Sequence, residues 1–312
     1  MNPSSPLAEP PNLALYTCAA FPNLYPDDLR LPSALAQVGL RGVPQRWDQP
    51  LSEPCAAGLL RSPWDYYLRP DAFLAFLHAH EQAARPLLNP VPLVRWNFDK
   101  HYLLSLAAQG VAIVPTKILP AIDDAMLPDL WREFGELVIK PTVSAGSWRT
   151  LRLPVGTRLP TEPPGRTRGA TFDSPSPEPS AYLVQPFLPQ IAEGEWSLIF
   201  FDGEFSHAVR KRPKPGEFRV QEHYGGSPEA TPPSESLLRQ AHAVLAALPR
   251  IPEAACPTPP CYARIDGVCD GDRFLLMELE LIEPALFFAY TQGGEERLAH
   301  AVRRSLQRAG LA

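Results

Sequence analysis

Several features that would assign a protein to a familiar class are missing from this sequence. No uncharged apolar run reaches the roughly 18 residues that a membrane-spanning helix needs. The opening segment, MNPSSPLAEPPN, lacks the basic stretch and the apolar run of a signal peptide. These absences lead us to expect a cytoplasmic protein without a membrane partner.

Cysteine pairs and an excess of positive charge are missing too. The 5 cysteines include no CxxC pair, and Cys256 and Cys261, which flank PTPP, lack the spacing of zinc ligands. An odd number of thiols in a chain of 312 residues indicates reduced cysteines in a reducing compartment. Because 29 Lys and Arg stand against 34 Asp and Glu, the net charge is −5, and the chain as a whole has no attraction for nucleic acid.

Neither of the standard phosphate-binding loops is present. The sequence contains no G-x-G-x-x-G and no G-x-x-x-x-G-K-[ST]. Proline, by contrast, is abundant: 39 of 312 residues, more than twice the usual share of about 5%. The prolines are not periodic and cluster in short groups, which predicts many loops, the longest being a proline-rich exposed loop at 154–180.

The spacing of apolar residues predicts a mixed α/β fold. Helices are expected at 27–38, 71–84, 100–108, 234–248 and 295–306. Strands are expected at 13–18, 43–47, 111–115, 137–140, 182–187, 262–268 and 273–283. Two β-rich runs, 196–201 and 204–211, are joined by Asp202-Gly203, which is a strong signal for a hairpin.

The strand expected at 273–283 carries two acids on one face. Successive strand side chains point to opposite faces, so Glu278 and Glu280 project together. Such a pair is stable when a cation compensates the charge, and Mg²⁺ bound by carboxylates and phosphates is a common solution. Asp266 lies on the preceding strand, and a hairpin would add it to the pair. The alternative is a solvated strand face, which the otherwise apolar strand argues against.

Cationic residues are placed to complement these acids. Lys140 ends an apolar strand, and the small residues at 142–147 follow it with backbone amides that can wrap phosphate oxygens. Lys100 opens the helix expected at 100–108, and Arg210 belongs to an Arg-Lys-Arg run at the end of the hairpin. Each of these alone is typical of a solvated surface. Together with the carboxylates they describe a site for Mg²⁺ and a polyphosphate.

The order of these segments resembles the ATP-grasp superfamily, and within it the group of D-cycloserine-forming ligases (O-ureido-D-serine cyclo-ligases). The matching segments are RWNFDKHYLLSLAAQGVAIVPT, VIKPTVSAGS, LVQPFLPQI, GEWSLIFFDGEFSHAVRKRP, GEFRVQEHYGG and LLMELELIEPALFF. The resemblance implies an α/β (α+β) ATP-grasp fold, with a Rossmann-like pre-ATP-grasp substrate domain at 1–94. The ATP-grasp domain would occupy 95–312, with a lid at about 111–186.

Carried over residue by residue, the resemblance implies a role for each candidate. ATP would be held by Lys100, Lys140, Ser144, Gly146, Gln185, Phe187 and Glu195. Mg²⁺, with Mn²⁺ as an alternative, would be held by Asp266, Glu278 and Glu280, although many relatives have Asn in the place of Glu280. Arg219 and Arg264 match arginines near the transferred phosphate and the reacting carbonyl, and Arg210 is a third catalytic candidate.

The first domain offers a substrate site in the segment RSPWDY, because ligands of α/β sheets collect at the carboxyl ends of strands. Asp65 is the candidate partner of a substrate ammonium, and Arg61 that of a carboxylate. Trp64 and Tyr66 belong to the same site or pack between the domains. A similar WDY stretch in the cycloserine-forming group favours the site.

The implied function is that of an ADP-forming ligase, which activates a carboxyl-type group as an acyl phosphate for attack by an amine. Cyclisation of a small amino-acid derivative such as O-ureido-D-serine is one form of it. The alternatives are a regulatory nucleotide-binding module and an ATP-grasp kinase. His207 and His223 are candidates for proton transfer or for purely structural hydrogen bonds. The expected partner is a small amino-acid-like molecule, and dimers are common in the superfamily, so a homodimer is an option.

Overall fold

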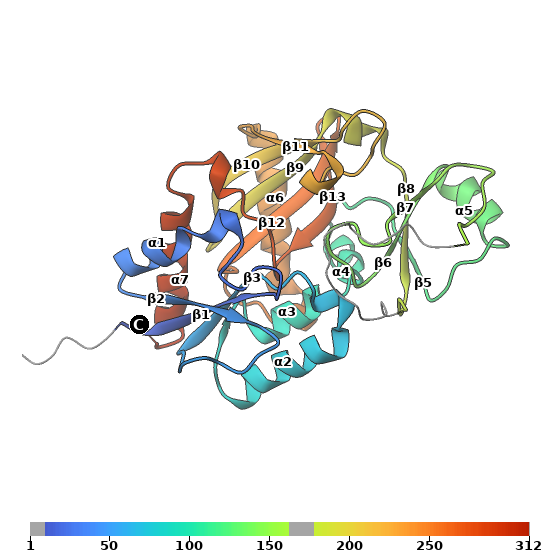
Figure 1. Ribbon diagram of the computed structural model, residues 1–312. Helices are drawn as coiled ribbons and strands as arrows, with labels where there is room; N and C mark the ends of the chain where they lie inside the picture. Colours follow the sequence, from blue (N-terminus) through green and yellow to red (C-terminus); the bar gives the residue numbers. More distant parts are fainter. Residues whose placement is uncertain (1–9, 162–177, 312) are drawn as a thin grey trace, which may run out of the picture.

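The computed structural model describes residues 10–161 and 178–311, and this part of the chain forms three β-sheets (Figure 1). The mixed α/β class predicted from the sequence is confirmed. Most of the proline-rich loop predicted at 154–180 lies outside the described residues. Among the described residues, no helix is both long and apolar enough to cross a membrane.

The N-terminal sheet is parallel, with the strand order β2-β1-β3-β4. Its strands are β1 (Asn12–Thr17), β2 (Arg41–Arg46), β3 (Ala57–Ser62) and β4 (Leu87–Leu88). The helices of this region are α1 (Leu31–Gln37), α2 (Pro70–Gln82) and α3 (Val91–Asn97). The helix expected at 27–38 is shorter, because a 3₁₀ turn at Pro26–Asp28 precedes α1, which starts with a proline in its first turn.

The second sheet is antiparallel and forms, with one helix, the green part at the right of Figure 1. Its order is β5 (Lys117–Leu119), β8 (Tyr182–Pro186), β6 (Leu137–Pro141) and β7 (Leu151–Leu153), and α5 (Leu127–Phe134) packs beside it. The strand expected at 111–115 was a wrong prediction. Its backbone makes only an isolated bridge from Ile113 to Leu276, so it runs along the third sheet without joining it as a strand.

The third sheet is antiparallel, with the order β11-β10-β9-β12-β13. Its strands are β9 (Glu195–Phe201), β10 (Glu204–Arg212), β11 (Ser227–Ala230), β12 (Tyr262–Asp270) and β13 (Arg273–Glu280). The predicted β9–β10 hairpin is confirmed. Asp202 and Gly203 turn it with φ of 54° and 82°, the positive values that the favoured two-residue hairpin turns require.

Helices pack on both faces of the third sheet and connect it to the N-terminal region. The helices α4 (Tyr102–Ala108) and α6 (Glu235–Ala247) pack on one face, and Ser234 caps α6 by accepting a hydrogen bond from the Leu237 N–H. On the other side, α7 (Gly294–Arg308) shares a core with α1 and β1. Residues before and after position 94 therefore share one hydrophobic core. The division into domains at 1–94 and 95–312 stays a prediction.

Candidate active site

A cavity of about 1060 Å³ brings together residues of the second and third sheets and of segments that follow strands of the N-terminal sheet, and most of the predicted site residues line it. Those on its wall are Trp64, Asp65, Tyr66, Lys100, Lys140, Ser144, Gly146, Gln185, Phe187, Glu195, Arg219, Arg264, Asp266, Glu278 and Glu280. Arg61 and Arg210 are absent from the wall. A cavity of this size exceeds the space that one drug-sized ligand fills, so a nucleotide and a second small molecule fit together.

Three carboxylates meet on β12 and β13. The antiparallel register places Asp266 opposite Glu278 and Arg264 opposite Glu280. One oxygen from each of Asp266, Glu278 and Glu280 lies within 4.8 Å of the others, which is close enough for a shared metal ion. Carboxylate oxygens are the ligands that Mg²⁺ and similar hard cations prefer, so the donor set fits such an ion.

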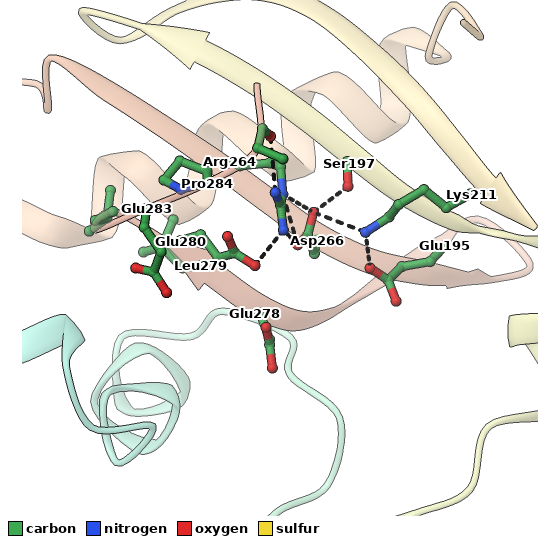
Figure 2. A network of polar contacts seen from close by, with 12 residues as sticks. Glu195, Ser197, Lys211, Arg264, Asp266, Glu278, Leu279, Glu280, Glu283 and Pro284 are labelled. Atoms are coloured by element: carbon green, nitrogen blue, oxygen red, sulfur yellow. Dashed lines mark hydrogen bonds and ion pairs between the residues drawn. The ribbon is translucent and has the colours of Figure 1, made fainter. Parts of the chain in front are cut away.

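Cations of the protein compensate this cluster (Figure 2). The Arg264 guanidinium donates to Asp266 at 2.8 Å and also contacts Glu280. Burial opposes ionisation of Glu278, but Lys140 and Lys100 outweigh it and lower the pKa of Glu278 to about 2. Burial raises the pKa of Glu280 to about 8 against the attraction of Arg264. Lysine and arginine side chains thus neutralise part of the charge of the cluster.

Lysines reach the cavity from three different elements. Lys140, at the end of β6, lies 2.7 Å from Glu278. Lys100, just before α4, donates to the backbone oxygen of Ser144 at 2.6 Å. Lys211, on β10, lies 2.5 Å from Glu195 and 3.9 Å from Asp266. Each lysine is buried and holds an oxygen that a phosphate could replace.

Lys211 corrects the prediction for Arg210. Neighbouring residues on β10 point to opposite faces, and Arg210 lies over the Trp196 ring, with its guanidinium 3.7 Å from exposed Glu193. Arg210 is therefore outside the cavity, while Lys211 is inside it. The alternation was available in the sequence, because Lys211 shares its strand face with the apolar Val209.

The small-residue segment after β6 lies over Lys100. Ser144 accepts the Lys100 ammonium on its backbone oxygen and donates its hydroxyl to the Pro141 oxygen. Gly146 has φ of +57°, a conformation that L side chains rarely adopt. The segment then docks on the N-terminal region through Trp148, whose ring lies 5.2 Å from that of Tyr67.

Three candidates for nucleotide binding lie on or after β8. Gln185 is buried, and its amide donates to the Thr116 hydroxyl at 2.9 Å. Phe187 lines the cavity, but its backbone N–H already donates to the Glu136 oxygen at 2.6 Å. Glu195 begins β9 and is paired with Lys211. All three residues line the cavity, as the resemblance to ATP-grasp proteins implied.

Arg219 lies on the segment between β10 and β11. Its guanidinium pairs with Glu217 at 2.7 Å and stacks 3.7 Å from the centre of the Tyr224 ring. This hydrogen bonding lowers the pKa of Glu217 to about 2. His223 also lines the cavity here, whereas buried His207 contacts the Leu286 oxygen and does not line it. The contacts of His207 fit the structural alternative.

The N-terminal wall differs from the prediction. Arg61 is fully buried on β3, where it pairs with Asp28 at 3.1 Å and donates to the Pro284 oxygen. It is held in a buried ion pair and does not line the cavity, so these contacts do not support its assignment to a substrate carboxylate. Asp65 lines the cavity, but one oxygen accepts from the Trp47 indole at 2.6 Å and the other pairs with Arg69 at 2.5 Å.

Comparisons with known proteins agree with this geometry. Residues 13–89 match the family model of the D-cycloserine synthetase DcsG N-terminal domain, and residues 167–250 match that of the ATP-grasp domain of prokaryotic glutathione synthetase. Cycloserine biosynthesis protein DcsG of Streptomyces lavendulae is 32% identical over 263 residues, which cover 80% of this chain and 83% of that protein. The chain belongs to the DcsG-like family of ATP-grasp ligases.

Solved structures agree. The crystal structure of D-cycloserine synthetase DcsG superposes with a TM-score of 0.76 at 29% identity, covering 95% of this chain and 99% of that one. A D-alanine–D-alanine ligase from Bacillus anthracis, at 12% identity and a TM-score of 0.61, shares the fold over 96% of this chain and 98% of its own. The DcsG-like protein described here is therefore an ATP-grasp ligase that forms C–N bonds, and such ligases use ATP and a divalent metal.

Proposed function

We propose that this DcsG-like ligase activates the carboxyl-type group of a small amino-acid derivative as an acyl phosphate and closes it onto a nitrogen of the same molecule. O-ureido-D-serine is the first substrate to test, because the relative DcsG is named for cycloserine biosynthesis. The single observation that carries the proposal is the meeting of three lysines and three carboxylates in one cavity.

The positively charged residues of the cavity are proposed to bind the phosphates of ATP, and polar and acidic residues its adenine and ribose. Lys100, Lys140 and Lys211 exchange their present oxygen partners for phosphate oxygens of ATP, which keeps each buried ammonium paired. Gln185 and Glu195, which line the same cavity, would hold the adenine and the ribose. The small-residue segment at 144–146 covers the phosphates and excludes water, which would otherwise hydrolyse an acyl phosphate.

Asp266, Glu278 and Glu280 would hold the divalent metal, and Mg²⁺ is the proposed ion. When bound, it neutralises charge on the phosphate oxygens during transfer. Arg264 contacts two of these acids and is proposed to stabilise the charge of the transferring phosphoryl group beside them. Arg219 is proposed for the same transfer from the segment before β11.

The experiment measures ADP, inorganic phosphate and the organic product together. Purified protein is incubated with ATP, Mg²⁺ and a panel of small amino acids that includes O-ureido-D-serine. A ligase releases ADP and phosphate in equal amounts with one compound and yields a cyclised or amide product. A stable phosphorylated product without phosphate release would replace the proposal by a kinase, and tight ATP binding with no turnover on any compound would favour a regulatory module.

A further inference from the structure

Glu283 is an acid of the cavity that the nucleotide and the metal leave unused. It lies three residues beyond Glu280, directly before Pro284, and only 8% of it is exposed. Its backbone oxygen accepts the Trp64 indole N–H at 2.9 Å, so the N-terminal wall and the end of β13 meet at this residue. Its side chain lines the cavity beside the metal-ligand cluster.

Glu283 differs from the neighbouring acids in its partners. Each of the four acids assigned to ribose or metal is paired with a lysine or arginine; these acids are Glu195, Asp266, Glu278 and Glu280. Within the part of the chain that the structure describes, the Glu283 carboxylate has no such salt bridge. Figure 2 shows the Glu280 carboxylate directed at Arg264 and that of Glu283 pointing away from it. Glu283 therefore has acceptor capacity to offer a ligand.

Tyr66 holds this carboxyl group in place. The Tyr66 side chain is buried and hydrogen-bonded to Glu283, and both residues line the cavity. Burial raises the pKa of Glu283 to about 7, against the opposing effects of Tyr66, Lys100 and Arg264 and with the help of Glu278. A carboxyl group that titrates near neutrality exchanges protons readily under working conditions.

Asp65, the acid first expected to bind a substrate nitrogen, has less acceptor capacity left than Glu283. Both Asp65 oxygens are engaged, one by Trp47 and the other by Arg69. Glu283, by contrast, is hydrogen-bonded to Tyr66 but has no salt bridge among the described residues, and it lines the same cavity as the cluster where the phosphoryl group would be transferred. Its signal in the sequence was a charged residue at the end of an apolar run, between Ile282 and Pro284.

We propose that Glu283 accepts the proton of the attacking substrate nitrogen and that Tyr66 is its positioning residue. The inference rests on the proposed function. The nitrogen lone pair forms the new C–N bond to the acyl carbon, and the C–O bond to the phosphoryl group breaks. Inorganic phosphate leaves with that electron pair, and the proton of the nitrogen passes to the Glu283 carboxylate.

The test separates activation from ring closure. Wild type, Glu283→Gln and Tyr66→Phe are supplied with ATP, Mg²⁺ and O-ureido-D-serine, and the cyclised product is measured per ADP formed. Glu222→Gln is the matched control, because it removes an acid from the exposed rim of the same cavity. Melting temperatures verify that each variant is folded. Parallel reactions contain hydroxylamine, which is unprotonated at neutral pH and traps an acyl phosphate without an enzyme base.

Glu283→Gln is expected to lower the rate of product formation by about a hundredfold or more, as loss of a general base does. ADP formation and hydroxamate trapping should fall much less, so the product per ADP drops. Tyr66→Phe should lower the same ratio to a smaller extent, and Glu222→Gln should leave it unchanged. An unchanged ratio in a folded Glu283→Gln variant overturns the inference alone. A wild type that forms no product and no hydroxamate overturns the proposed function, and the inference falls with it.

Discussion

Two walls of the same cavity treat charge in opposite ways. Behind the N-terminal wall, Arg61 and Asp28 form a fully buried pair that does not line the cavity, and on the wall itself Asp65 is bound by two neighbours. On the wall built by β10, β12 and β13, pairs such as Lys211 with Glu195 also exist, but they open onto the cavity. The first kind of pair supports the structure, and the second kind can be exchanged for a ligand.

The difference teaches how to separate structural from functional charges. Removing one partner of a buried pair leaves an uncompensated charge that nothing else can reach, so stability suffers. In a pair on a cavity wall, each charge instead neutralises the other until a phosphate or a metal replaces one partner. Activity, and not stability, should therefore depend on the second wall, as is common where functional sites hold groups that do not optimise stability.

The largest expected effect is at the buried ion pair behind the first wall. Arg61→Ala should lower the free energy of unfolding by about 3–5 kcal/mol, because Asp28 is left buried without its cation. Denaturant unfolding followed by circular dichroism measures it. Arg132→Ala is the control, since Arg132 and Asp129 are an exposed pair on α5 whose loss should cost about 0–1 kcal/mol. A stable Arg61→Ala protein with a raised KM for the amino-acid substrate would return Arg61 to the substrate site.

The two walls also show what the sequence could reveal. Glu278, Glu280 and Asp266 were predictable because alternation along β13 and a short hairpin leave few other arrangements. Arg61 was not, because a sequence carries no sign that Asp28, far away in the chain, would meet it inside the protein. Burial of a charge depends on packing between distant segments, and local patterns do not encode it.

Strands and helices were predictable to a similar degree. The hairpin of β9 and β10 follows from alternation and an Asp-Gly turn, which are local signals. The segment 111–115 has the composition of a strand but makes only one bridge to the edge strand β13, and composition alone does not encode how far two segments run side by side. Short elements such as β7 and β11 have little periodicity to detect, so only the neighbouring strands define them.

On the second wall, Glu278→Gln should lower ATP-dependent ADP formation by about 10²–10³-fold, the range seen when one charge-stabilising group is removed from an active site. The change deletes a carboxylate of the metal-ligand cluster and the partner of Lys140. Stability should stay close to that of the wild type. Glu204→Gln, at the exposed start of β10, is the control. If Glu278→Gln lost stability but kept its turnover, Glu278 would be a structural charge like Arg61, and the proposed difference between the walls would be wrong.

A third test uses pH on a group that lies off the cavity. Burial lowers the pKa of His207 to about 4, from an unfolded value of about 6.5. Between these pH values the unfolded chain binds the proton and the folded chain does not, so stability is present above pH 6.5 and is lost as the pH falls toward 4. The loss is at most about 3 kcal/mol.

The His207→Gln variant should show a shallower decline of the unfolding free energy across this pH range than the wild type. His78→Gln, on the exposed side of α2, should keep the wild-type slope. Urea titrations at several pH values provide the measurement. Equal slopes in all three proteins would mean that the pKa of His207 is the same in the folded and unfolded states, which contradicts the prediction.

The smallest effect on turnover is expected for Arg210, the neighbour of the cavity residue Lys211. Arg210→Ala should change turnover by less than about twofold, because the guanidinium lies outside the cavity and its contact with exposed Glu193 is of the kind that contributes about 0–1 kcal/mol. Lys211→Ala should lower turnover about 10–100-fold, since it leaves Glu195 and Asp266 without a shared cation and removes a phosphate ligand. Steady-state ADP release with both variants measures the contrast. If Arg210→Ala were the more damaging change, the outer face of β10 would have to reach the nucleotide, and the alternation of β10 side chains would no longer separate the two kinds of charge.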